Sequence, residues 1–196
     1  MKVTVTKVTS WTDVLNAARF TQRKKLLDKE PSDKFKRQMV RAEHSPLRAL
    51  IFYIDFYDIP YYVAMHFRTH KLVHLPLVST SRPDIDGNQK PRNEQLKTDK
   101  VNMRLMLDAQ EIIAISRVRL CNKAEFATRE AWVTAILELH KIEPILASAC
   151  VPSCVYRQIC PEIKPCGFNK TREYLKVLDG YINNLTEFKD DSKRTD

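Results

Sequence analysis

Glycine is scarce in this sequence, which has only Gly87, Gly167 and Gly180 among its 196 residues. No two of the three lie near one another. The phosphate-binding loops of Rossmann and P-loop proteins need several glycines within about eight residues, because their backbone amides must approach a phosphate closely. The scarcity therefore excludes both kinds of loop, and any bound nucleotide has to be held mainly by side chains.

Long hydrophobic runs are also missing. No stretch approaches the roughly 20 apolar residues of a membrane-spanning helix. The first residues, MKVTVT, alternate as in a β-strand and do not form the apolar block of a signal peptide. Apolar residues still make up 43% of the chain, which is enough for a sizeable core. We expect a soluble, cytoplasmic protein with no membrane partner.

The length of the chain fits one domain, since domains commonly run to about 100–200 residues. We expect a single domain over residues 1–188 and a flexible tail over 189–196. Prolines and charges predict a mobile loop near 82–99. The segment 150–166 carries four cysteines, and we expect irregular structure around it, over 147–168.

Apolar periodicity predicts a mixture of strands and helices. Alternation predicts a strand over 2–8, and a dense run of aromatic and β-branched residues predicts another over 47–57. Helices are predicted over 11–25, 32–42, 58–71, 101–120, 123–140 and 170–185.

Positive charge is in excess, with 33 Lys and Arg against 24 Asp and Glu and a net charge of +9. Such a balance suits anionic partners, namely nucleic acid, a membrane surface or phosphorylated metabolites. Scattered, solvated charges without a partner are the alternative explanation.

Three histidines, His66, His70 and His74, are spaced so that one helix face would present all of them. Three imidazoles can ligate zinc and leave a position open for water. No carboxylate lies within the run, and Pro76 follows closely. A face of histidine and lysine that contacts an anionic ligand is therefore the favoured interpretation.

Four of the five cysteines crowd into one proline-containing segment. An odd total without a secretion signal argues against a disulfide scaffold. A structural zinc ion would organise such a segment, although the spacing differs from paired CxxC knuckles, and ordinary thiols are the alternative. The candidate zinc ligands are Cys150, Cys154, Cys160 and Cys166.

Arginines gather at the predicted junction between two helices, with Arg117 and Arg119 before it and Arg129 after it. Guanidinium groups match phosphate and a polarised uracil oxygen, because they donate planar, paired hydrogen bonds. The hydroxyls of residues 79–81 beside Arg82 can cradle a phosphate or form a plain turn. No catalytic triad, HExxH motif, Walker pair or known DNA-binding motif is found.

Taken in order, several segments resemble the flavin-dependent thymidylate synthases. The early segment NAARFT resembles the family's Ala-Ala-Arg helix, and His44-Ser45-Pro46 resembles its His-x-Ser-Pro element. The stretch 60–71 resembles the helix that leads into the family's Arg-His-Arg signature, and Ser79 follows at close to the spacing of the signature's serine. The stretch 119–130 resembles the substrate-binding arginine and the helix after it.

The chain departs from the family pattern in two places. Thr69-His70-Lys71 stands where the signature has Arg-His-Arg, and Arg48-Ala49 stands where Glu-His is expected. These departures indicate a divergent, phage-like member, which would act in the host cytoplasm.

The resemblance implies an α/β (α+β) fold with a central, mostly antiparallel sheet flanked by helices. It implies reductive methylation of dUMP to dTMP with FAD, NADPH and methylenetetrahydrofolate, in a homotetramer with shared active sites. By the same resemblance, Arg119 and Arg82 are catalytic. The flavin is expected at Arg68, His70, Lys71 and His74. The substrate is expected at Ser79, Ser81, Arg82, Arg117 and Arg119.

Other functions stay open at this point. One is a related modification of a pyrimidine nucleotide. Another is a non-catalytic nucleotide- or nucleic-acid-binding relative that keeps the fold, whereas the synthase interpretation does not expect nucleic acid. A third is a small interaction protein stabilised by zinc at the cysteine segment.

Overall fold

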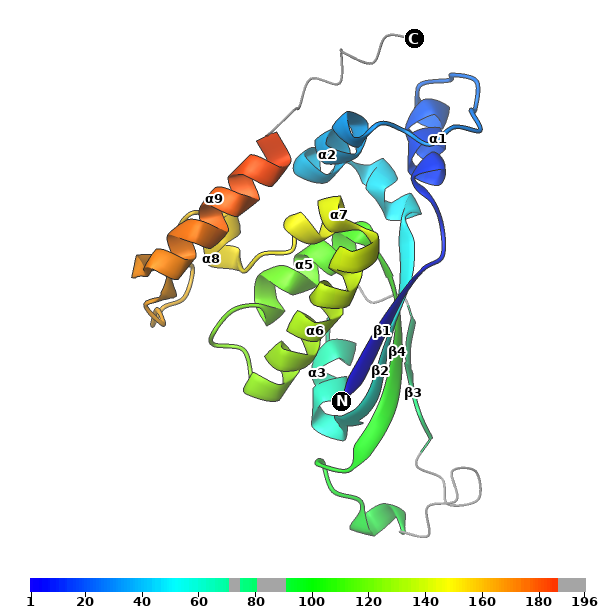
Figure 1. Cartoon of the computed structure of the whole chain (residues 1–196). Helices are drawn as coiled ribbons and strands as arrows, with labels where there is room; N and C mark the ends of the chain where they lie inside the picture. The colour runs from blue at the N-terminus through cyan, green and yellow to red at the C-terminus, as the bar shows by residue number, and fades with distance from the viewer. Residues whose placement is uncertain (71–74, 81–90, 187–196) are drawn as a thin grey trace.

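The structure is a computed structural model that describes residues 1–70, 75–80 and 91–186. A four-stranded antiparallel sheet in the order β1-β2-β4-β3 carries helices on one face (Figure 1). The strands are β1 (Lys2–Lys7), β2 (Ile51–Pro60), β3 (Leu75–Val78) and β4 (Lys100–Asp108). The helices are α1 (Trp11–Thr21), α2 (Asp33–Ala42), α3 (Tyr61–Arg68), α5 (Ala109–Arg119), α6 (Phe126–Ile142), α7 (Pro144–Ser148), α8 (Ser153–Tyr156) and α9 (Arg172–Thr186). The expected mixed fold with an antiparallel central sheet is confirmed.

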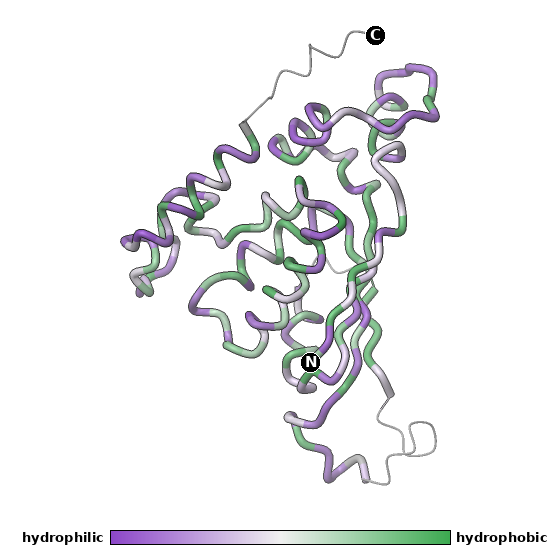
Figure 2. The backbone as a smooth tube through the Cα atoms, in the orientation of Figure 1, coloured by the Kyte–Doolittle hydropathy of each residue, from purple (hydrophilic) through white to green (hydrophobic). Residues whose placement is uncertain are grey.

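Side chains alternate between the two faces of the sheet. On the inner face Ile54 of β2 lies opposite Val5 and Leu105, and it is fully buried. On the outer face Asp55 lies opposite Arg104. Because successive residues of a strand point to opposite faces, one face supplies the core and the other carries more polar groups. Hydrophobic and hydrophilic residues accordingly alternate along the chain in Figure 2.

The prediction of one helix over 101–120 is wrong. Its first part is β4 (Lys100–Asp108), and only its second part is helix, α5 (Ala109–Arg119). Asp108 separates the two elements, because its side chain accepts a hydrogen bond from the Glu111 amide at 2.9 Å while Glu111 accepts from the Asp108 amide at 2.7 Å. This reciprocal pair is a capping box, which begins a helix.

Several predicted boundaries also shift. The strand expected over 47–57 begins later, after a short 3-10 helix at Ser45–Ala49. Helix α3 is shorter than the predicted 58–71, and α1 ends before residue 25. The expected mobile loop lies mostly outside the described residues, although a 3-10 turn occupies Arg92–Glu94. The expected tail over 189–196 also lies outside them.

The core is centred on large aromatic side chains between the sheet and the helices. Phe67 of α3 stacks on Phe56 of β2, with ring centroids 4.9 Å apart, and lies 5.5 Å from the ring of Trp132 of α6. Trp132 donates its indole N–H to the hydroxyl of Ser116 at 2.9 Å, so its buried polar group is satisfied. These contacts fix α3, α5 and α6 relative to the sheet.

The buried carboxylate of Glu143, which follows α6, joins that helix to β1 and α1. Glu143 accepts hydrogen bonds from the indole of Trp11 at 2.8 Å and from Lys7 at 2.7 Å. The carboxylate is paired and hydrogen-bonded, as a buried charge must be. None of the helices in the described ranges is long and apolar enough to cross a membrane.

The register of β4 can be tested by matched leucine truncations. Leu105→Ala removes a fully buried side chain from the inner face and is expected to lower the free energy of unfolding by about 2–5 kcal/mol. Leu175→Ala, at a 61% exposed position of α9, is expected to change it by no more than about 0.5 kcal/mol. Urea denaturation measures both, and equally small costs would contradict this register.

Candidate functional site

The ends of two helices, α3 and α5, meet at Arg119, the last residue of α5. Its Nε donates to His70 Nε2 at 2.7 Å, and its Nη2 donates to the backbone carbonyl of His66 at 2.7 Å. Thr69 caps the end of α3 with a hydroxyl that donates to the same carbonyl at 2.9 Å. The arginine therefore ties the end of α5 to the last turn of α3.

A second set of polar side chains joins α3 to the beginning of α6. Glu125 caps α6 and accepts from the Thr128 amide and hydroxyl, both at 2.8 Å. Since that hydroxyl has only one hydrogen to donate, the contact of 2.8 Å between Thr128 and His66 Nδ1 requires the imidazole to donate. Tyr62 reaches Glu125 at 3.5 Å.

Burial and neighbouring charge set the protonation of this site. Burial, with a further contribution from Arg119, lowers the pKa of His70 to about 4. The ring is therefore neutral at neutral pH, as an acceptor from Arg119 must be. Burial also lowers the pKa of Arg119, but an arginine remains charged at neutral pH. The centre of positive charge is the guanidinium of Arg119.

The carboxylate of Glu125 stays ionised in the same region. Burial raises its pKa, but hydrogen bonds from Thr128 and Ala127 and the charge of His66 outweigh burial and leave the pKa below its ordinary value. The phenol of Tyr62 is affected in the opposite sense, because burial and the adjacent Glu125 raise its pKa. Glu125 thus holds the polar network in place as a fixed acceptor.

Arg119 is suited to binding an anion. Its side chain donates to an imidazole and to a carbonyl, and both of these acceptors are neutral. Among the described residues no carboxylate lies within ion-pair distance of it. A partly buried guanidinium without an anionic partner gains most when a phosphate or another anion pairs with it.

The structure brings together some of the predicted site residues and not others. His70 and Arg119 meet directly, whereas Arg68 is exposed at the end of α3. Ser79 continues β3, where its amide donates to the Asn102 carbonyl and its hydroxyl accepts from the Asn102 amide. The remaining candidates, Lys71, His74, Ser81 and Arg82, lie outside the described residues.

Arg117 does not join Arg119. It forms an ion pair with Glu43, and its guanidinium carbon lies 3.6 Å from the ring centroid of Tyr156. Side chains two positions apart on a helix point in different directions, so the two arginines contact different parts of the fold. Arg117 links α5 to the end of α2 and to α8.

Sequence reasoning missed Tyr62, Glu125 and Thr128. Glu125 and Thr128 stand in the reverse of the usual capping-box order, which has Ser or Thr at the cap and Glu or Gln three positions later, so the sequence carries no N-cap signal there. Nothing in the sequence alone indicated that His66 would contact this cap.

The four cysteines predicted to bind zinc are not brought together. Cys150 belongs to the main core, where its thiol lies 3.6 Å from the Leu146 carbonyl and burial raises its pKa to about 12. The other three predicted ligands, Cys154, Cys160 and Cys166, line a separate hollow. The three-histidine face is also interrupted, since α3 ends before His70.

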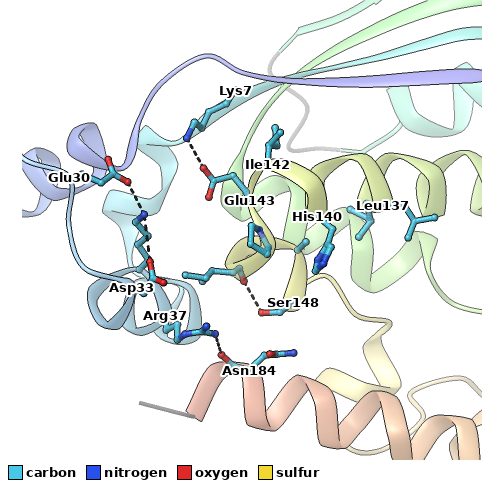
Figure 3. Close-up of a pocket in the computed structure, with 15 residues that line it drawn as sticks. Lys7, Glu30, Asp33, Arg37, Leu137, His140, Ile142, Glu143, Ser148 and Asn184 are labelled. Atoms are coloured by element: carbon cyan, nitrogen blue, oxygen red, sulfur yellow. Dashed lines mark hydrogen bonds and ion pairs between the residues drawn. The ribbon is translucent and has the colours of Figure 1, made fainter. Parts of the chain in front are cut away.

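A larger hollow of about 500 Å³ lies between α2, α6, α7 and α9 (Figure 3). It contains none of the predicted site residues. The charged groups that line it are largely paired with one another, which leaves little net charge to attract a ligand. The pairs are Lys7 with Glu143 and Lys36 with Glu30, both at 2.7 Å, and Arg37 donates to the Asn184 carbonyl.

No protein-family model matches the sequence, and no curated protein matches it. Solved structures match its fold, which is the fold of flavin-dependent thymidylate synthases and of a related nucleotide methylase. The first is ThyX from Helicobacter pylori in complex with FAD and dUMP, with a TM-score of 0.63 and 12% identity, covering 77% of this chain and 100% of that one. The second is the UMP/dUMP methylase PolB from Streptomyces cacaoi bound to 5-Br dUMP, with a TM-score of 0.58 and 11% identity, covering 76% and 94%.

The neutral state of His70 predicts acid sensitivity. Between pH 6.5 and about 4 the unfolded chain binds a proton at His70 that the folded protein does not bind. We expect the free energy of unfolding to fall as the pH is lowered through this window. In His70→Gln, whose amide oxygen can still accept from Arg119, the free energy of unfolding should decrease less than in the wild type over the same pH range.

Urea denaturation at a series of pH values measures the effect. His140→Gln, at an exposed position of α6, is the matched control and should keep the wild-type pH dependence. A His70→Gln curve that is parallel to wild type throughout would contradict a buried, neutral His70.

Proposed function

We propose that this chain, as a single domain over residues 1–188, methylates the pyrimidine ring of dUMP in the cytoplasm. The observation that carries the proposal is the fold, which overlaps the full length of a thymidylate synthase chain solved with FAD and dUMP. A second structure with the same fold is a UMP/dUMP methylase bound to a dUMP analogue. The contact between the charged Arg119 and the neutral His70 lies where the sequence resembles the family's binding motifs.

In this proposal Arg119 is the catalytic and substrate-binding arginine. Its guanidinium is half-buried, has no carboxylate partner among the described residues and is held by two hydrogen bonds, so it would orient and polarise an anionic pyrimidine nucleotide. Arg82 shares that role by resemblance. The nucleotide phosphate would be held by Ser79, Ser81, Arg82 and Arg117, although Arg117 is already paired with Glu43.

Flavin binding is proposed for the residues around His70. The net charge of +9 and the neutral, hydrogen-bonded imidazole fit a large anionic cofactor that lies against the end of α3. FAD would supply reducing equivalents from NADPH, and methylenetetrahydrofolate would supply the carbon. The residues proposed to hold the flavin are Arg68, His70, Lys71 and His74.

A second candidate substrate is UMP. PolB is a methylase of UMP and dUMP, so the same fold accepts either nucleotide in that protein. The two nucleotides differ only at the 2′ position of the sugar, and a competition between them distinguishes the two activities.

The absorption spectrum of the purified protein is the first test. We expect a flavin band that corresponds to about one FAD per chain, and oxidation of NADPH that depends on dUMP and methylenetetrahydrofolate. A colourless protein that binds dUMP but takes up no added FAD would be a non-catalytic nucleotide-binding protein. Binding of neither ligand would contradict the proposal as a whole.

Arg119→Ala tests the role of the arginine. We expect dUMP binding to weaken by about 1.5–3 kcal/mol, or roughly 10- to 150-fold in Kd, because a charge-assisted hydrogen bond is lost. Arg172→Ala, which removes the same charge from an exposed position of α9, should leave the affinity unchanged. Isothermal titration measures both, and an unchanged affinity in Arg119→Ala would remove this residue from the site.

The proposal includes a homotetramer with shared active sites, and the outer face of the sheet is its proposed contact surface. Leu75 and Leu77 are 42% and 49% exposed there, beside Met106 and Tyr53. Arg104 is fixed on this face by two hydrogen bonds of 2.7 Å to Asp55. An ordered surface with exposed leucines is suited to burial against a second copy of the chain.

Leu77→Asp places a charge on that surface and is expected to lower the molar mass measured by light scattering, because the carboxylate would be desolvated in the contact. Leu175→Asp, on the exposed side of α9, is the control and should leave the mass unchanged. A wild-type monomer, or an assembly that Leu77→Asp does not affect, would contradict this contact surface.

A further inference from the structure

Four thiols line one small hollow of about 100 Å³ beside α5 and α8. They come from three separate places: Cys121 follows the end of α5, Cys154 lies in α8, and Cys160 and Cys166 lie in the segment 157–167. Cys150, which the sequence grouped with three of them, is not part of the lining. The fold thus replaces Cys150 by Cys121, which is far from the others in the sequence.

Two buried polar atoms mark the same hollow. The Nε of Arg117 and the Oδ1 of Asn169 have no hydrogen-bond partner, and they are the two side-chain atoms of this kind among the described residues. Both residues line the hollow. A buried donor without an acceptor is costly, and a sulfur anion in the hollow would supply one. After rotation of its amide, Asn169 would present a second donor to such an anion.

The segment that carries Cys160 and Cys166 has little core of its own. Ile159 and Ile163 are 67% and 98% exposed, so its large apolar side chains contribute little burial. A lysine from the α5–α6 turn reaches across to it, since Lys123 donates to the Lys164 carbonyl at 3.2 Å. A segment with so little buried apolar surface is commonly held by a disulfide or a metal ion.

We propose that this hollow binds a zinc ion through the thiolates of Cys121, Cys154, Cys160 and Cys166. Four thiolates are a common ligand set of structural zinc, and each thiol releases one proton to solvent as its sulfur binds the metal. In the described residues no three such side chains already lie close enough to share a metal ion. Zinc binding would therefore require the segment 157–167 to move toward Cys121 and Cys154.

Charged side chains near the hollow bear on the charge of the proposed zinc site. A zinc ion with four thiolates carries two net negative charges, which nearby cations stabilise. Arg117 and Glu162 both line the hollow, and Lys123 adds a cation nearby through its hydrogen bond to the Lys164 carbonyl. Arg117 is shared with the proposed phosphate-binding set, but the zinc proposal rests on the four thiols and not on dUMP binding.

Zinc content of the full-length protein, purified with a phosphine reductant and without chelator, tests the proposal by elemental mass spectrometry. We expect about one zinc ion per chain in the wild type and in Cys150→Ser. Most of the zinc should be lost in Cys121→Ser and in Cys166→Ser. Cys166 is exposed, so its replacement removes a ligand without disturbing a packed side chain.

Cobalt provides a second readout. The wild type loaded with Co²⁺ should show the sulfur-to-metal charge-transfer bands and strong visible absorption of a tetrahedral thiolate site, and Cys166→Ser should lose them. Full zinc retention in Cys121→Ser, or loss in Cys150→Ser, would overturn the ligand set. A wild type that binds no zinc after incubation with zinc chloride, or that forms a disulfide among these cysteines instead, would overturn the site.

Discussion

The alternation of side chains along β2 and β4 is the constraint on which the other elements depend. It sends Ile54 and Leu105 to one face of the sheet, where they are fully buried, and sends Asp55 and Arg104 to the other. The helices that supply the core must therefore all pack on the inner face. Helices α3, α5 and α6 share this layer, so their ends meet, and the contact of Arg119 with His70 follows from that arrangement.

Much of the fold could be predicted from the sequence, and the failures have a physical cause. Both the alternation of β4 and the helical period of α5 are apolar patterns, and without a proline or glycine between them the two elements merge into one predicted helix. The boundary is a side-chain cap at Asp108, which a periodicity argument does not detect. The segment 147–168, expected to be irregular, is mostly so, although it includes the end of α7, the short α8 and the first residue of a 3-10 helix at Phe168–Lys170.

The candidate site could be predicted only in part. His70 and Arg119 follow from the resemblance, and the structure places them in contact. The sequence motif did not show that Arg117 and Arg119 have different roles. Side chains two positions apart on a helix differ by about 200° in direction, and Arg117 accordingly points toward Glu43. Cys121 likewise could not be grouped with the other thiols from the sequence, because only the folded structure brings it to the same hollow.

The edge strand β3 limits how the molecule can associate. It is four residues long and contains Pro76, which has no amide hydrogen to donate to a further strand. A short edge with a proline resists the strand-to-strand pairing that leads to domain-swapped or fibrillar aggregates. A protein whose outer sheet face carries exposed leucines can therefore associate through that face in solution, while the edge of β3 does not pair with strands of further molecules.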